Sequence, residues 1–249
     1  MPFLDHLEEL RWRIIWSLLA LVVCTAIGFY TAVQFDLLSV LKRPLDPYIG
    51  AVPLQALSVT DPFFLTFRLA LTLGVVLAFP VIAYQVWSFL APALTPRERR
   101  AIVPALYLGA VLFSAGVALA YVYVLPMTLG FLQGFQTPSL KLALTGNFYF
   151  GFVIKLLVAF GVIFELPVVV LVLATMGLVT SKFLASKRRY AVAGMAITAS
   201  LITPGDAITA TLFMMGPLML LYELSILLAK VVERSRARDA ATDALAGAQ

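Results

Sequence analysis

Long apolar stretches alternate with short polar segments along most of the chain. Six stretches consist almost entirely of uncharged, mainly hydrophobic residues: 14–33, 64–90, 101–125, 148–177, 190–202 and 207–229. A helix needs about 20 apolar residues to cross the roughly 30 Å hydrocarbon core of a bilayer, and most of these stretches reach that length. The pattern therefore predicts an all-α polytopic membrane protein with six transmembrane helices.

Two of the predicted helices depart from a simple crossing. Stretch 148–177 is longer than one straight crossing needs, and Pro167 removes the hydrogen bond to the Ile163 carbonyl, so we expect a bend there. Stretch 190–202 rises only about 20 Å as a helix, which is too little for an unthinned bilayer. We expect the last two helices to be short and to form a hairpin that thins the membrane.

The segments outside these stretches also have distinct patterns. Segment 2–13 has apolar residues at i, i+4 and i+7 and acidic residues on other faces, which predicts an amphipathic helix along the interface before the first span. Segment 34–63 has four prolines and several apolar residues, which favour an ordered outer cap. Segment 231–249 is Ala-rich with mixed charges and is predicted to be a disordered tail. Residues 1–230 are then a single membrane domain.

The composition supports the membrane assignment. Hydrophobic residues make up 62% of the 249 residues and charged residues 12%, about half the charged fraction of soluble domains. A soluble globular protein is therefore excluded. The net charge of +5 is not accompanied by a basic face with aromatics or by a nucleic-acid-binding motif, so no nucleic-acid partner is expected.

Motifs of catalytic and metal chemistry are missing from the sequence. His6 is the single histidine and Cys24 the single cysteine, which excludes a cluster with metal-ligand spacing. The sequence has no Walker A motif, dinucleotide-binding fingerprint or nucleophile elbow. We therefore expect no enzyme activity, no cofactor and no bound metal.

Basic residues are distributed unevenly between the two sides of the predicted bundle. Six crossings leave both termini on one side, and cytoplasmic loops of membrane proteins are enriched in Lys and Arg. We therefore predict cytoplasmic termini, because that side then holds most of the 18 basic residues. They are Arg11, Arg13, Arg97, Arg99, Arg100, Lys182, Lys187, Arg188, Arg189, Lys230, Arg234, Arg236 and Arg238.

Acidic residues on the same side are candidates for binding. Glu9 and its neighbour Glu8 have two interpretations: pairing with nearby Arg11, Arg13 or another loop, or accepting a cationic ligand. Glu98 follows Thr95 at the spacing of a capping box, which alone explains an acid there. The alternative is that Glu9 and Glu98 form a two-carboxylate site for guanidinium groups, which carboxylates bind with paired hydrogen bonds.

Glu165 lies well inside the fourth predicted span, where a charged carboxylate is costly and indicates a functional site. Lys155 is the obvious ion-pair partner, but ten helical positions separate the two residues by about 15 Å and leave them about 80° apart around the axis. They cannot meet along one helix, so Glu165 meets water or polar groups in a concavity, or is protonated. Asp206 either caps the last helix or contributes to function.

Four motifs, taken in order, resemble one family, TatC, the multispanning subunit of the twin-arginine protein translocase. They are HLEELR at 6–11, the stretch 85–100, FELP at 164–167 and LITPGD at 201–206. The similarity extends over about residues 3–230. Any one of these motifs alone is weak, whereas four of them in order on a six-span pattern are specific.

The resemblance implies a glove-like bundle in the bacterial cytoplasmic (inner) membrane that recognises signal peptides bearing paired arginines. It implies that small single-span subunits of the TatA/TatB type join it in an oligomeric complex that exports folded proteins with the proton-motive force. By the same resemblance Glu9 and Glu98 bind the two arginines, and Arg11 belongs to the same signature. Pro44 matches the outer-loop proline, and Glu165 is the polar residue of the concave face.

Two positions depart from the pattern of the family. Lys155 is an unexpected charge in the fourth span, and Ala210 stands where some relatives carry a glutamine in the sixth span, where a partner helix would dock. Arg68 lies close enough to the start of the second predicted span for its guanidinium to extend to the interface. Membrane lipids are expected partners, held by Arg97, Arg99 and Arg100. A competing interpretation from another functional class is a proton-coupled small-molecule transporter with Glu165 as proton carrier, although no internal repeat supports it.

Overall fold

The computed structural model describes the chain except for residues 1–2, 51–52, 91–101, 135–143, 203–208 and 247–249. The described residues are helical apart from loops and one isolated parallel bridge between Gln55 and Thr145. In order, the elements are α1 (Phe3–Gln34), α2 (Leu37–Lys42), the 3₁₀ turn η1 (Arg43–Leu45), α3 (Asp46–Ile49), α4 (Asp61–Leu90), α6 (Ile102–Leu119), the π-turn η3 (Ala120–Val124), α7 (Leu125–Gln133), α8 (Gly146–Ile163), α9 (Leu166–Thr175), α10 (Ser181–Ser186), α11 (Arg188–Ile202) and α12 (Thr209–Ala246).

Five helical stretches within the described residues are long and apolar enough to cross a membrane. They are His6–Gln34, Asp61–Phe89, Pro104–Leu132, Gly146–Thr175 and Met215–Ser235. Each overlaps one of the predicted spans, so the all-α membrane fold is confirmed. The remaining predicted span corresponds to α11, whose 15 residues rise about 22 Å and match the short helix expected there.

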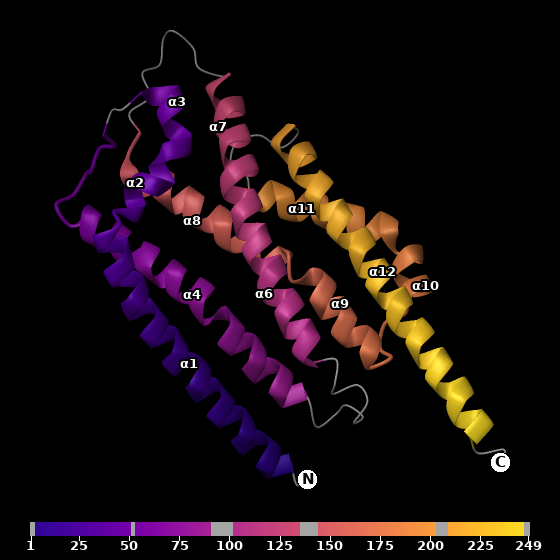
Figure 1. Cartoon of the computed structure of the whole chain (residues 1–249). Helices are drawn as coiled ribbons and strands as arrows, with labels where there is room; N and C mark the ends of the chain where they lie inside the picture. The colour runs from indigo at the N-terminus through magenta and orange to yellow at the C-terminus, as the bar shows by residue number, and fades with distance from the viewer. Residues whose placement is uncertain (1–2, 51–52, 91–101, 135–143, 203–208, 247–249) are drawn as a thin grey trace.

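Helices α1 and α4 lie side by side along their length (Figure 1). Two glycines permit this contact: a methyl group on Gly28 would lie 2.6 Å from the Ala70 carbonyl oxygen, and one on Gly74 would lie 2.8 Å from the Thr25 backbone. Small residues at such positions let membrane helices pack closely without a hydrophobic driving force between them. The opposite face of α1 exposes large apolar side chains such as Val22, as a lipid-facing helix does.

The predicted amphipathic helix 2–13 is not a separate element. Helix α1 runs without a break from Phe3 to Gln34 and therefore joins this segment to the first span. No proline or glycine precedes Gly28 within α1, so nothing in the sequence interrupts the helix at the expected turn. The acidic residues of this segment therefore lie on a helix that continues along the axis of the first span and does not turn into the plane of the interface.

Proline shapes the third and fourth spans. Helix α8 ends at Ile163 and α9 begins at Leu166 with Pro167 in its first turn, so the predicted bend is confirmed. In the third span the π-turn η3 ends two residues before Pro126, which lies in the first turn of α7 and has no N–H to continue the regular ladder. Helices α6 and α8 pack through the buried ring of Phe113 against Gly161.

Three tyrosines fasten the cap formed by α2, η1 and α3 to the bundle. The Tyr149 hydroxyl of α8 donates to the Leu41 carbonyl at 2.8 Å, and the Tyr121 hydroxyl donates to the Val40 carbonyl at 2.6 Å. Tyr48 in the cap donates in return to the Pro126 carbonyl at 3.1 Å. The carbonyls of Val40 and Leu41 belong to the last turn of α2, where the regular helix leaves carbonyls without a backbone donor, although the Arg43 N–H also donates to the Val40 carbonyl.

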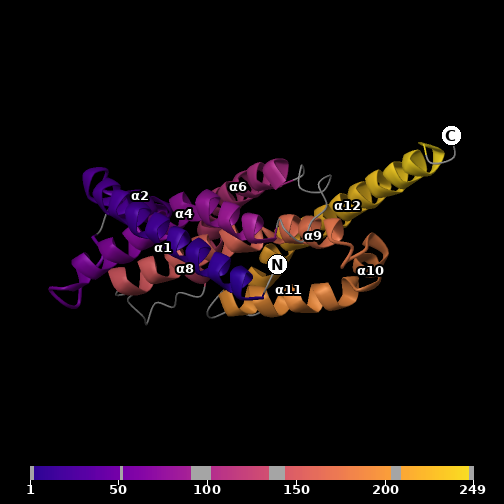
Figure 2. The ribbon, with the colours of Figure 1, turned by 90° about the horizontal axis from the view of Figure 1, so that it is seen from below.

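The C-terminal helix differs from the expectation of a short last span and a disordered tail. Helix α12 has 38 residues and continues to Ala246, projecting from the other helices (Figure 2). Segment 231–246 has no proline or glycine and many alanines, which favour a helix even without an apolar face. The first turn of segment 231–246 is held by Glu233, whose carboxylate accepts the Ser181 N–H at 2.7 Å and the Ser181 hydroxyl at 2.6 Å.

Candidate functional site

Glu9 lies in the second turn of α1, at the end of the bundle where the N-terminus of the chain is found (Figure 1). The Arg13 guanidinium, one turn further along, donates to Glu9 Oε1 through Nε at 3.0 Å and also through Nη2. The other oxygen, Oε2, lies 3.8 Å from His6 Nδ1 and accepts no hydrogen bond from the described residues. The carboxylate is half-buried. It already holds one guanidinium through a single oxygen.

Two side-chain contacts connect this part of α1 to the end of α4. Arg13 Nη1 donates to Gln85 Oε1 at 3.4 Å, across 72 positions of sequence. The His6 ring stacks on Phe89 with a centroid distance of 4.4 Å and an interplanar angle of 15°. Glu9 therefore lies beside the last turn of α4, directly before the segment that follows Leu90.

The structure places the other predicted residues of this site only in part. Arg11 and Glu8 are exposed, and neither forms an ion pair or hydrogen bond with any other residue of the described part of the chain. The interpretation in which Glu9 pairs with a basic neighbour is observed, with Arg13 as that neighbour. Glu98 lies outside the described residues, so its pairing with Glu9 stays a prediction.

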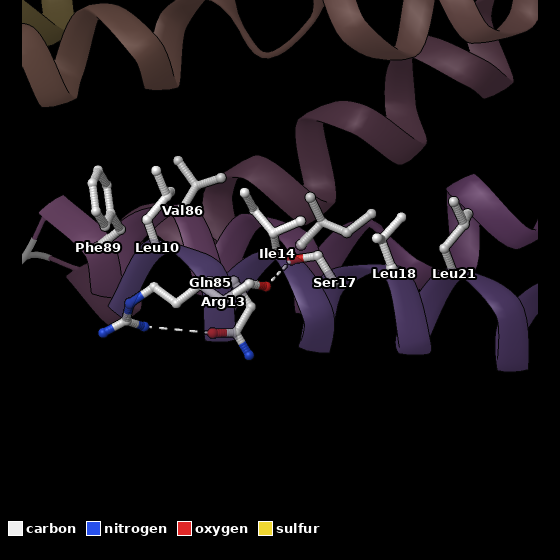
Figure 3. Close-up of a pocket in the computed structure, with 10 residues that line it drawn as sticks. Leu10, Arg13, Ile14, Ser17, Leu18, Leu21, Gln85, Val86 and Phe89 are labelled. Atoms are coloured by element: carbon white, nitrogen blue, oxygen red, sulfur yellow. Dashed lines mark hydrogen bonds between the residues drawn. The ribbon is translucent and has the colours of Figure 1, made fainter. Parts of the chain in front are cut away.

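An apolar groove of about 250 Å³ runs between α1 and α4 from this polar end. Leu10, Ile14, Leu18 and Leu21 line it from α1 and lie in one row in Figure 3. Ser17 also faces the groove, but its hydroxyl donates to the Arg13 carbonyl at 2.8 Å. The groove thus combines a long apolar wall with a charged mouth. Its α4 wall consists of Ile82, Gln85, Val86 and Phe89.

Glu165 occupies the joint between α8 and α9, the residue directly before the first turn of α9. Its carboxylate lies against α6, where a methyl group on Gly109 would be 3.0 Å from Oε2. Oε1 is buried and has no hydrogen-bond partner among the described residues. Lys155 is exposed on α8 and forms no ion pair with Glu165, as the helix geometry predicts. The absence of Cβ at Gly109 is what leaves room for this carboxylate.

A second hollow, of about 360 Å³, opens beside Glu165 between α4 and α9. Its walls are apolar apart from the carboxylate, so Glu165 borders an apolar hollow in which no polar group of the described residues meets Oε1. Its functional role stays a prediction. An apolar hollow with a single carboxylate suits an apolar helix that carries one polar group. It is lined by Phe79, Ile82, Ala83, Val86 and Trp87 of α4 and by Val168, Val169, Val172 and Leu173 of α9.

The two remaining predicted residues are in connecting segments. Pro44 lies in the first turn of the 3₁₀ turn η1 of the outer cap. An N–H group at this position has no acceptor within the element, so a proline costs no hydrogen bond there. Asp206 lies outside the described residues. Within the described part of the chain, no group of three His, Cys, Asp or Glu side chains is arranged to hold a metal.

Sequence reasoning missed two contributors to the site at the end of α1. Gln85 contacts Arg13 across 72 positions, and Phe89 stacks on His6, so neither contact follows from helical periodicity. The signal available was their place in the motif stretch beginning at residue 85. The Glu9–Arg13 pair, in contrast, has the i, i+4 spacing that favours an ion pair within one helix.

Long apolar helices in one bundle, with charged groups at one end and one carboxylate in the middle, define a polytopic membrane protein. The family model described as Sec-independent protein translocase protein (TatC) matches residues 5–217. The chain therefore belongs to the TatC family. The TatC protein of Aquifex aeolicus is 39% identical over 238 residues, which cover 95% of this chain and 98% of the relative. TatCy of Bacillus subtilis is 32% identical, with 98% and 94% covered.

The solved structures agree with this assignment. A crystal structure of the twin arginine translocase receptor TatC has a TM-score of 0.78 and 39% identity, and covers 92% of this chain and 99% of that one. A second, determined in DDM, has a TM-score of 0.79 with 90% and 99% covered. The chain is therefore a multi-pass inner-membrane component of the twin-arginine translocase, and not an enzyme. The small-molecule transporter interpretation has no support in these similarities.

Proposed function

We propose that the chain binds twin-arginine signal peptides at the polar end of α1 and α4, with Glu9 and Glu98 accepting the two arginine side chains. One observation carries the proposal: Glu9 already holds a guanidinium, that of Arg13, through Oε1, while Oε2 has His6 Nδ1 at 3.8 Å, beyond hydrogen-bond length. A carboxylate has acceptor sites for more than one donor group, so Oε2 is suited to a second guanidinium. Arg11, exposed on the same helix end, belongs to this site.

The groove between α1 and α4 supports the same proposal. Leu10 and Leu21 are eleven positions apart, so the apolar row on α1 extends about 16 Å. Signal peptides carry a charged start followed by an apolar region of about 7 to 15 residues, which spans roughly 10 to 22 Å as a helix. Glu9, paired with Arg13 beside the mouth of the groove, is the group that suits the basic first part of such a peptide, and the apolar wall suits the second.

The test is a titration of the purified protein in detergent with a fluorescent twin-arginine signal peptide. Glu9→Gln keeps the shape of the side chain and removes its charge, so the peptide affinity is expected to fall about 10- to 100-fold, the effect of losing a charge-assisted hydrogen bond. Glu8→Gln is the matched control, because it removes the same charge from the neighbouring exposed residue. Equal affinities for Glu9→Gln and the native chain would refute the assignment.

We propose further that the hollow beside Glu165 receives the apolar helix of a TatA/TatB-type subunit during proton-motive-force-driven export. The apolar walls from α4 and α9 and the unpartnered Oε1 of Glu165 support this role. Glu165→Ala is expected to reduce crosslinking of that subunit to Val169, which is 48% exposed in the hollow, while peptide affinity stays unchanged. Equal loss of both would indicate that Glu165 acts only in folding.

A further inference from the structure

Two cations lie inside apolar helices and are not used by the sites described above. Arg68 belongs to α4 and Lys155 to α8, and both side chains are exposed. Ionisable residues within membrane spans are costly, and they are retained where they serve a site or a partner. Neither cation forms an ion pair with any acidic side chain in the described part of the chain.

Arg68 lies against α8 one helical turn before Lys155. Arg68 Nη1 lies 3.5 Å from Asn147 Oδ1 and would lie 3.3 Å from a methyl group on Gly151. Asn147, Gly151 and Lys155 follow each other at intervals of four, so neighbours in this series lie one turn, about 6 Å, apart on adjoining parts of the helix surface. Since Cα–Cβ bonds tilt toward the helix N-terminus, the Lys155 side chain extends back toward Gly151 and the guanidinium.

Both cationic groups are within reach of the membrane interface. Helices α4 and α8 start close together, because backbone hydrogen bonds join Gln55 to Leu144 at 3.2 Å and to Gly146 at 3.0 Å. Arg68 follows the start of α4 by about 10 Å of helix rise, and Lys155 follows the start of α8 by about 14 Å. Long cationic side chains bury their stems along apolar surface and place their charged ends near the headgroups.

The surroundings favour a ligand with an anionic head and apolar chains. Arg68 has five N–H donors, and its one described acceptor, Asn147 Oδ1, is at the limit of hydrogen-bond length. Asp61, the acid nearest to Arg68 in sequence, already accepts the Leu57 N–H with Oδ2. On the Arg68 face of α4, Phe64 and Leu71 are 59% and 42% exposed at positions i−4 and i+3. Exposed apolar side chains around two cations complement the phosphate and acyl chains of a lipid.

We propose that Arg68, Asn147 and Lys155 form a binding site for the phosphate of an anionic phospholipid, with its acyl chains along α4 and α8. The guanidinium donates to the phosphate oxygens, the ammonium neutralises the remaining charge, and the Asn147 amide nitrogen provides another donor. Gly151 leaves the space in which the guanidinium lies. The start of α8, which carries Asn147, is at the opposite end of the bundle from the N-terminal end of α1, which carries Glu9 (Figure 1). The site therefore does not depend on peptide binding.

Native mass spectrometry of the purified full chain, titrated with phosphatidylglycerol or phosphatidylcholine, tests this site. We expect the first phosphatidylglycerol to bind about tenfold more tightly than phosphatidylcholine, and Arg68→Gln with Lys155→Gln to remove this preference. Lys182→Gln with Arg189→Gln is the control, since it removes the same charge from exposed positions on α10 and α11 and is expected to keep the preference.

A second variant distinguishes loss of the lipid site from a folding defect of the double variant. Asn147→Asp keeps the shape of the side chain and places a carboxylate beside Arg68, so it is expected to lower the phosphatidylglycerol affinity several-fold by occupying the guanidinium. Equal binding of the two lipids by the native chain would overturn the proposal, and so would an equal loss in the control pair. Equal binding is also the result expected if a carboxylate of a partner helix were the ligand.

Discussion

Removing the Tyr149 hydroxyl tests how the outer cap is held on the bundle. Tyr149 is 4% exposed, and its hydroxyl donates to the Leu41 carbonyl at 2.8 Å across 108 positions of sequence. Leu41 is itself 8% exposed and lies at the end of α2, where the helix leaves carbonyls without backbone donors. Tyr149→Phe therefore leaves a buried carbonyl oxygen without a hydrogen bond while it keeps the aromatic packing.

The expected cost follows from this burial. Leaving a buried acceptor unsatisfied costs about 1 to 3 kcal/mol, which raises the equilibrium for release of the cap roughly 5- to 150-fold. Hydrogen–deuterium exchange of the amides in residues 37–49 measures that equilibrium, and those amides are expected to exchange faster while α6 and α9 keep their protection. Tyr107→Phe is the control, because that side chain is 76% exposed. Unchanged exchange of the cap in Tyr149→Phe would refute the reasoning.

Two further substitutions test contacts between helices. Gly109→Ala adds a methyl group 3.0 Å from Glu165 Oε2 and is expected to reduce export several-fold without changing peptide affinity; Gly194→Ala, which meets no atom within 4 Å, is the control in both assays. Glu233→Gln weakens both hydrogen bonds to Ser181 and is expected to cost about 1 kcal/mol, seen as a lower melting temperature. A melting temperature equal to that of the native chain would show that this contact adds no stability.

The membrane fold was predictable because apolar length and proline position are local signals. Five apolar runs correspond to helices of spanning length, and the break at Pro167 follows from one missing N–H. The helical continuation of α12 beyond the last span was not predictable from hydrophobic pattern, since segment 231–246 has no apolar face. Its alanines favour a helix through backbone propensity instead.

The sequence indicated which residues form the candidate site, but it did not indicate which of them contact each other. Glu9 and Glu165 were identified because acids are unusual at their positions, and the Glu9–Arg13 pair has a helical spacing. The Arg13–Gln85 hydrogen bond and the contact of Glu165 with Gly109 join different helices. Such pairs depend on how the helices pack, and periodicity within one helix carries no information about them.

The central claim is that Glu9 recognises a guanidinium of the signal peptide. A double-mutant cycle measures this most directly: the affinities of a twin-arginine and a twin-lysine peptide are compared for the native chain and for Glu9→Gln. Arginine presents a planar fork to a carboxylate and lysine a single ammonium, so the native chain is expected to prefer the twin-arginine peptide at least about tenfold. In Glu9→Gln that preference is expected to shrink several-fold. An undiminished preference in the variant would contradict the role of Glu9.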